Sequence, residues 1–251
     1  MASPIMHGAE PFAADGGPHG VLLLHGFTGN CYSVSGVAHR FADLGWAVEC
    51  PLLPGHGTTL DDMLPTGWSD WSAAAEEAFE RLAARVEGRI VVVGLSMGGA
   101  LTVWLATRHP DIAGIVCINP WVAPAGQLRD IVQAGIDSGQ EVIASIGSDI
   151  ADPDANELSY PGSPLRPMLS LFDGVNELQP DLARVACPIL LVTSRHDHVV
   201  PPFNSDHLAS AVAVPVERVW LERSYHVATL DYDKDEVESR TIEFATKVAA
   251  A

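Results

Sequence analysis

The sequence predicts an α/β protein in which helices cover both faces of a mostly parallel sheet. Short apolar runs recur along the 251 residues, and such runs are typical of strands that are buried on both sides. Stretches with the spacing of amphipathic helices separate these runs, and this alternation is the pattern of a parallel sheet. The alternation stops over residues 119–181, which indicates an insertion into an otherwise regular chain.

The expected elements follow in order after a lead-in rich in glycine and proline. Strands are expected at residues 21–24, 46–50, 90–93, 112–118, 189–192 and 215–221. Helices are expected at residues 34–44, 69–86, 97–109 and 235–249, and a loop at residues 51–67. Asp70 or Ser72 is the expected N-cap of the second helix, because both side chains can accept a hydrogen bond from a helix start.

The insertion has no strong strand pattern. Residues 119–181 carry only weak amphipathic patches, such as that around Ile131, and several prolines interrupt them. Sheets of this class bind ligands at the carboxyl ends of their strands. We therefore expect residues 1–118 and 182–251 to form an α/β core, with residues 119–181 as a small inserted cap over that edge.

The composition excludes several functional classes. Hydrophobic residues make up 47% and charged residues 18%, which is typical of an ordered globular protein. A net charge of −18 repels phosphate backbones and argues against nucleic-acid binding. The first residues lack the basic start and apolar core of a secretory signal, and no apolar run reaches membrane-spanning length. The four scattered cysteines are expected to be buried free thiols, so we expect a cytoplasmic protein.

Ser96 lies in the pentapeptide GLSMG, between an apolar strand run and a helix-like stretch. Strand, sharp turn and helix form the setting in which G-x-S-x-G becomes a nucleophile elbow. The serine at such a turn has a strained backbone and a hydroxyl that points out of the fold. Gly94 and Gly98 are required because side chains there would collide where the strand packs against the helix. The sequence therefore predicts that Ser96 is a nucleophile.

A serine hydroxyl needs a base within hydrogen-bond reach, and the base needs an acid that orients it. After a nucleophile elbow the acid comes next along the chain and the histidine comes last. Of the ten histidines, His226 lies just beyond the last expected strand, where a loop can bring it over Ser96. Asp197 follows an apolar strand run, where its carboxylate can fix the imidazole tautomer. Asp231 and Asp233 follow His226 too soon and fit the start of the last helix better.

The other histidines suggest a metal site as an alternative. His196 and His198 flank Asp197, but no second group of ligands occurs at a matching spacing, so we expect neither a metal nor a cofactor. His25 and His56 lie in tight glycine-rich turns and are interpreted as structural residues.

The oxyanion of a tetrahedral intermediate requires hydrogen-bond donors. The backbone N–H of Met97, directly after the nucleophile, is the first candidate. The backbone N–H of Phe27 is the second, in a loop whose glycines allow it to turn back toward the site.

These pieces occur in the order oxyanion loop, elbow, insertion, acid and base, and the ordered set resembles the serine esterases and lipases of the α/β-hydrolase fold. The resemblance covers nearly the whole chain. Within this group, the chain is similar to the bacterial monoacylglycerol lipases in particular. The stretches that carry it are HGFTGN at 25–30, PGHGT at 54–58, GLSMGG at 94–99, DHVVPP at 197–202, SYHVATLDYD at 224–233, SIGSD at 145–149 and NELSY at 156–160.

The resemblance implies substrate contacts for two residues of the insertion. Ile146 corresponds to a residue that lines the acyl and glycerol pocket, and Glu157 to one that contacts the glycerol hydroxyls. A carboxylate can hydrogen-bond two hydroxyls well, and a simple alkyl ester would leave it unpaired. The alternatives are an exposed glutamate and ordinary cap packing of the isoleucine.

The sequence thus predicts a metal-independent serine hydrolase that cleaves monoacylglycerols to a fatty acid and glycerol. A general carboxylesterase or an acyltransferase with the same triad is the alternative, and a non-catalytic receptor is a third interpretation that the complete triad disfavours. The expected partner is a small lipid ester and not a nucleic acid, and the apolar cap could also contact a lipid surface. The sequence leaves the acyl length and the oligomeric state open.

Overall fold

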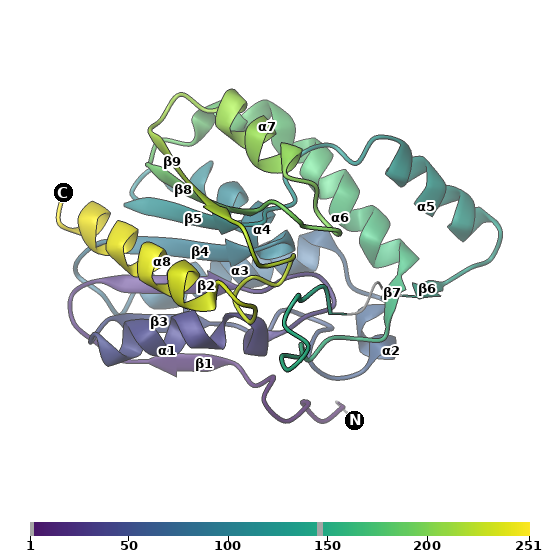
Figure 1. Ribbon diagram of the computed structural model, residues 1–251, viewed down its shortest axis with the longest axis horizontal. Helices are drawn as coiled ribbons and strands as arrows, with labels where there is room; N and C mark the ends of the chain where they lie inside the picture. Colours follow the sequence, from purple (N-terminus) through teal and green to yellow (C-terminus); the bar gives the residue numbers. More distant parts are fainter. Residues whose placement is uncertain (1–2, 145–147) are drawn as a thin grey trace.

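The computed structural model describes residues 3–144 and 148–251 (Figure 1). Within them a seven-stranded sheet has the order β1-β3-β2-β4-β5-β8-β9. Every neighbouring pair is parallel except β1 and β3. The bounds are Phe12–Ala14 for β1, Gly20–Leu24 for β2, Ala47–Cys50 for β3, Ile90–Leu95 for β4, Gly114–Ile118 for β5, Ile189–Ser194 for β8 and Val216–Leu221 for β9.

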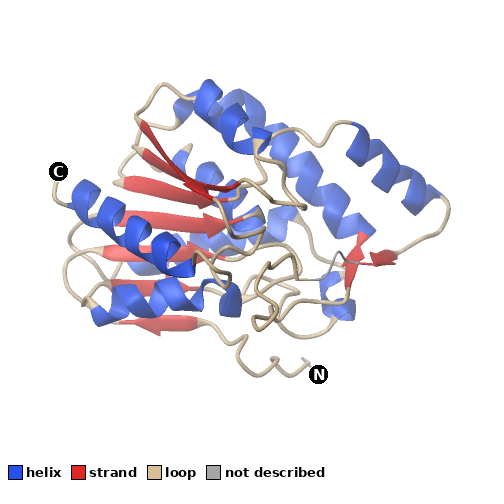
Figure 2. Ribbon diagram, viewed as in Figure 1, coloured by secondary structure: helices blue, strands red, loops and turns tan. Residues whose placement is uncertain are grey.

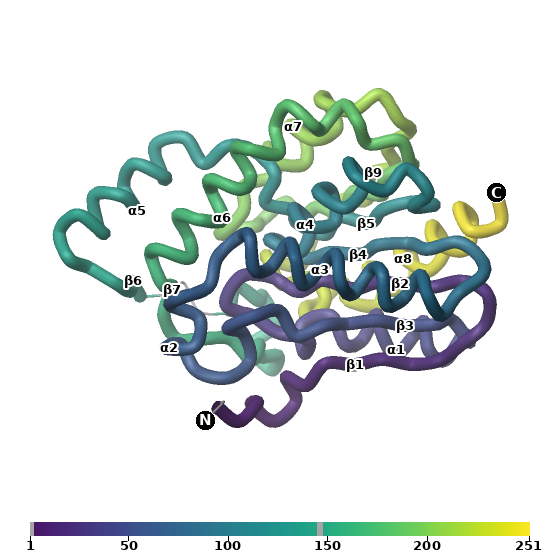
Figure 3. Tube along the Cα trace, turned by 180° about the vertical axis from the view of Figure 1, so that it is seen from behind, coloured from purple at the N-terminus to yellow at the C-terminus, as the bar shows by residue number. Residues whose placement is uncertain are grey.

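Helices cover both faces of this sheet, as Figure 2 shows. Helices α1 (Ser35–Asp43) and α8 (Lys234–Ala249) lie on one face, and α3 (Trp68–Ala83) and α4 (Met97–Ala106) lie on the other, which Figure 3 views from behind. Alternate strand residues therefore enter two separate hydrophobic clusters, one on each face. The predicted mostly parallel sheet with helices on both faces is confirmed.

Several local predictions were wrong. Strand β1 lies in the expected lead-in, where three residues are too few to show a strand pattern. A short helix, α2 (Leu60–Met63), interrupts the expected loop, because Thr59 caps it by accepting a hydrogen bond from the N–H of Asp62. Gly67 is the N-cap of α3, and Asp70 instead reaches back to accept the N–H of Gly67 at 2.9 Å.

The insertion lies beyond the carboxyl ends of the strands (Figure 1). It contains α5 (Gln127–Asp137), the antiparallel strands β6 (Val142–Ala144) and β7 (Gly162–Pro164), α6 (Leu165–Leu178) and the first residues of a 3-10 helix (Gln179–Arg184). The two strands were not expected, since three-residue strands leave no alternation to detect. Helix α6 packs its buried face on the core, whereas α5 stands out at the side of the molecule. The division into core and cap stays a prediction.

The helices of the described residues include none that combines the length and the apolar character needed to cross a bilayer. The four cysteines are buried and free.

Candidate active site

Ser96 occupies the turn between β4 and α4. Its backbone has φ 57° and ψ −117°, a strained conformation for a residue with a side chain. Hydrogen bonds on both sides hold this turn: the N–H of Ser96 donates to the carbonyl of Ile118 at 3.0 Å, and its own carbonyl accepts the N–H of Gly99 at 2.9 Å. Backbone bonding from the neighbouring strand and from the first turn of the helix therefore offsets the cost of the strain.

No side chain fits at Gly94 or Gly98, two residues before and after Ser96, because backbone atoms occupy the space. A Cβ on Gly94 would overlap the carbonyl oxygen of Gly98, and a Cβ on Gly98 would overlap that of Leu24. Carbonyl oxygens of the strand and helix cannot move aside as a flexible side chain can. The turn thus requires glycine at both positions.

His226 and Asp197 are in direct contact. Imidazole Nδ1 lies 2.8 Å from Asp197 Oδ2, and the other oxygen, Oδ1, accepts the N–H groups of Val199 at 2.9 Å and Val200 at 2.7 Å. Since Nδ1 carries the proton that Asp197 accepts, Nε2 is left free to act as a base. Ser96 and His226 both line one cavity.

The charge state of His226 reflects two opposing effects. Burial is the largest single effect, and it favours the neutral imidazole and lowers the pKa. The carboxylates of Asp197, Glu157 and Asp149 together outweigh it, Asp197 contributing most, so the pKa of His226 is raised. A site that stabilises the imidazolium in this way favours transfer of a proton from Ser96 to His226.

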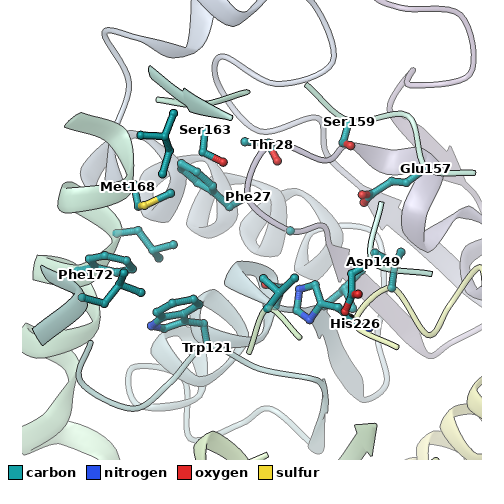
Figure 4. Close-up of a pocket in the computed structure, with 18 of the residues that line it drawn as sticks. Phe27, Thr28, Trp121, Asp149, Glu157, Ser159, Ser163, Met168, Phe172 and His226 are labelled. Atoms are coloured by element: carbon teal, nitrogen blue, oxygen red, sulfur yellow. Dashed lines mark hydrogen bonds between the residues drawn. The ribbon is translucent and has the colours of Figure 1, made fainter. Parts of the chain in front are cut away.

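The cavity has a volume of about 240 Å³ and two chemically different ends (Figure 4). His226, Asp149 and Glu157 lie toward one end, and Met168 and Phe172 of α6 lie toward the other. The apolar wall is formed by Trp121, Leu128, Ile143, Met168, Leu171 and Phe172. The arrangement fits a ligand with a polar head and an apolar chain.

The expected oxyanion donors lie next to Ser96. A Cβ on Gly26 would lie 3.3 Å from the Cβ of Ser96, so the loop that carries Phe27 lies directly against the serine. Phe27 lines the cavity. Met97 is the first residue of α4, and its N–H therefore has no acceptor within the helix.

Glu157 lies on the cavity wall, and small residues surround its carboxylate. A Cβ on Gly29 would lie 3.0 Å from Glu157 Oε1, so the glycine leaves room for the carboxylate. Burial raises the pKa of Glu157, while His226 and the hydroxyls of Ser159 and Ser33 oppose that rise. The side chain lines the same cavity as His226 and is only partly exposed. Ile146 lies outside the described residues, and its expected role stays a prediction.

His25 and His56 are buried with their rings 4.9 Å apart, and neither lines the cavity. His25 Nε2 accepts the N–H of Leu53 at 3.1 Å, and its Nδ1 lies 3.0 Å from the carbonyl of Gly26. Burial lowers the pKa of His25 to about 4 and that of His56 to about 3, so both rings are neutral at pH 7. These contacts fit the structural roles that were predicted for them.

The side chains around Asp197 turn toward separate partners. Asp197 faces His226, whereas His198 Nδ1 lies 2.8 Å from Asp149 Oδ1. Asp231 and Asp233 precede α8, as expected, but their carboxylates also turn back to accept the N–H groups of Tyr225 and Ser224.

Sequence reasoning missed Asn119 and Asp149. Asn119 follows β5 with φ 43°, and its amide donates to the carbonyl of His226 at 2.8 Å. Asp149 accepts the N–H of His226 at 3.0 Å. The motif SIGSD contains Asp149, but no local pattern shows where its carboxylate points.

Three comparisons place the chain among known proteins. A thermostable monoacylglycerol lipase of Bacillus sp. (strain H-257) is 45% identical, over 98% of this chain and 98% of that protein. A carboxylesterase of Bacillus subtilis (strain 168) is 28% identical over 95% and 97% of the two chains. A solved structure described under LipS and LipT, two metagenome-derived lipolytic enzymes, superposes with a TM-score of 0.92 at 39% identity, over 97% of this chain and 100% of that one.

The family model described as serine aminopeptidase, S33, matches residues 18–233, which include Ser96, Asp197 and His226. The structural comparison agrees with this family match, because the lipolytic structure shares the mostly parallel sheet with its flanking helices. The chain therefore belongs to this serine hydrolase family, Hydrolase_4, and has the α/β-hydrolase fold.

Proposed function

We propose that the protein hydrolyses monoacylglycerols to a fatty acid and glycerol through the triad Ser96, His226 and Asp197. The observation that carries this proposal is the cavity that Ser96 and His226 share, with carboxylates at one end and an apolar wall at the other. The 45% identity to a monoacylglycerol lipase over nearly the whole chain supports the same substrate class.

The proposed mechanism has two halves. Ser96 Oγ attacks the ester carbonyl while His226 Nε2 takes its proton, and the oxyanion accepts hydrogen bonds from the N–H groups of Phe27 and Met97. His226 then gives the proton to the departing glycerol oxygen, which leaves an acyl-enzyme. Water attacks the acyl carbonyl while His226 takes its proton, the bond between the acyl carbon and Ser96 Oγ then breaks, and His226 returns the proton to Oγ as the fatty acid departs.

Glu157 selects the alcohol in this proposal. Its carboxylate is held at the polar end beside His226, where it can accept hydrogen bonds from two glycerol hydroxyls. An alkyl ester brings no hydroxyl, so the hydrogen bonds that glycerol would donate to this carboxylate are missing when that ester binds.

Two further features belong to the proposal. Helix α5 exposes Leu128, on the cavity rim, and Ile131, and we infer that this face contacts lipid surfaces while a substrate enters. The four buried free thiols favour a cytoplasmic location.

Glu157→Ala tests the choice of substrate. We expect kcat/KM for a monoacylglycerol to fall roughly 10- to 100-fold, because charged hydrogen bonds to the glycerol are lost, and kcat/KM for the ethyl ester of the same acid to change less than about threefold. Steady-state kinetics on both esters measures this, with Glu177→Ala on the exposed face of α6 as the control. Equal losses on both esters would favour a general carboxylesterase instead.

A further inference from the structure

Asp149 is a buried carboxylate that bonds two separate loops at once. Its Oδ2 accepts the N–H of His226 at 3.0 Å and the N–H of His198 at 3.1 Å. Its Oδ1 lies 2.8 Å from the imidazole Nδ1 of His198, and its backbone carbonyl accepts the N–H of Val227 at 3.1 Å. Asp149, a residue of the insertion, therefore connects His198, which follows Asp197, to His226.

These contacts distinguish Asp149 from Asp197. The side chain is only 7% exposed, and a carboxylate with so little solvent must be hydrogen-bonded. Both oxygens are engaged by groups of the protein: Oδ2 accepts two backbone N–H groups and Oδ1 lies against His198 Nδ1. Asp149 contacts His226 through the backbone N–H, whereas Asp197 contacts the ring.

The backbone of His226 is held from its other side as well. The amide of Asn119 donates to the carbonyl of His226 at 2.8 Å, and its oxygen accepts the N–H of Ser194 at 2.7 Å. The peptide groups on either side of the base are thus fixed by side chains from distant parts of the chain. Such supporting contacts matter because small misplacements of a catalytic group cost large factors in rate.

We propose that Asp149 is a positioning residue, whose carboxylate joins the loop of the acid to the loop of the base and so places the His226 imidazole between Asp197 and Ser96. The inference rests on the proposed function, because the placement affects turnover only if His226 is the base. It also couples the insertion to the triad, since Asp149 belongs to the insertion and lines the cavity.

The negative charge of Asp149 adds an electrostatic effect that a neutral support would lack. The carboxylates that raise the pKa of His226 against burial are Asp197, Glu157 and Asp149. His198, edge-on to the ring of Tyr225, is the titratable side chain that bonds Asp149 directly. Asp149→Asn keeps the shape and an acceptor but removes the charge, so it should lower the pKa of His226.

The test compares Asp149→Asn and Asp149→Ala with Asp154→Asn, a matched change at an exposed residue of the same segment. We expect kcat/KM for a monoacylglycerol to fall on the order of 10²-fold in Asp149→Ala and roughly three- to tenfold in Asp149→Asn. The acid limb of the pH profile should move to lower pH in Asp149→Asn and stay in place in Asp154→Asn. A change in rate at every pH with no movement of the limb would overturn the proposal.

An NMR titration of the His226 imidazole gives a second readout that does not depend on turnover. A lower pKa in Asp149→Asn than in wild type and in Asp154→Asn supports the proposal, and equal values in all three overturn it. Absence of ester hydrolysis by the wild type would refute the proposed function alone, because the titration still reports on Asp149. Thermal melting shows whether each variant is folded. If Asp149→Ala does not fold, the isosteric Asp149→Asn alone tests the proposal.

Discussion

Asp197→Asn is expected to lower kcat on monoacylglycerols by roughly 10³- to 10⁴-fold while the protein stays folded. Oδ1 of Asp197 accepts the N–H groups of Val199 and Val200, so an asparagine must place its oxygen there and its NH₂ group toward His226. An NH₂ group can only donate, so His226 Nδ1 must lose its proton and Nε2 must carry one. The imidazole would then be in the wrong tautomer to accept the proton of Ser96.

Steady-state kinetics and thermal melting together check this expectation. The melting temperature should fall less than in Asp197→Ala, which leaves both backbone N–H groups without an acceptor. A kcat within about tenfold of wild type would show that Asp197 does not orient the base.

Gly98→Ala is expected to destabilise the protein by about 3 kcal/mol or more, because the new methyl group overlaps the carbonyl oxygen of Leu24 on the adjacent strand. Relief requires β2 and α4 to separate, which disturbs Ser96 as well. Urea denaturation measures the free energy of unfolding, and ester hydrolysis should fall with it.

Gly139→Ala is the matched control for this change. Gly139 has φ 86°, and no atom lies within 4 Å of the position that a Cβ would take, so alanine there meets backbone strain without a collision. The expected cost is about 1–2 kcal/mol. If the two variants were equally stable, crowding at the elbow would not be the reason for glycine at position 98.

Much of the fold could be predicted because buried parallel strands are short and wholly apolar. The run 90–93 shows this, since its residues are buried on both faces in β4. The pairing of His226 with Asp197 was also predictable, because both residues follow strands that end at the same edge of the sheet. Elements of three residues, such as β1 and β6, leave too little pattern to detect.

The supporting contacts could not be predicted, for a physical reason. Asp149 is 77 residues from His226 along the chain, and Asn119 is 107 residues from it. Their side chains bond backbone groups, and backbone groups are the same at every residue, so no residue type in the sequence marks the partner. The contact between Gly29 and the Glu157 carboxylate is similar, since the two residues lie in distant loops.

Every role proposed for the cavity depends on Ser96 being a nucleophile that His226 activates. Labelling with a fluorophosphonate, followed by peptide mapping with mass spectrometry, tests this directly. We expect one adduct, on Ser96, which is lost in Ser96→Ala and forms far more slowly in His226→Ala. No labelling of the folded wild type, or an adduct on another residue that persists in Ser96→Ala, would contradict it.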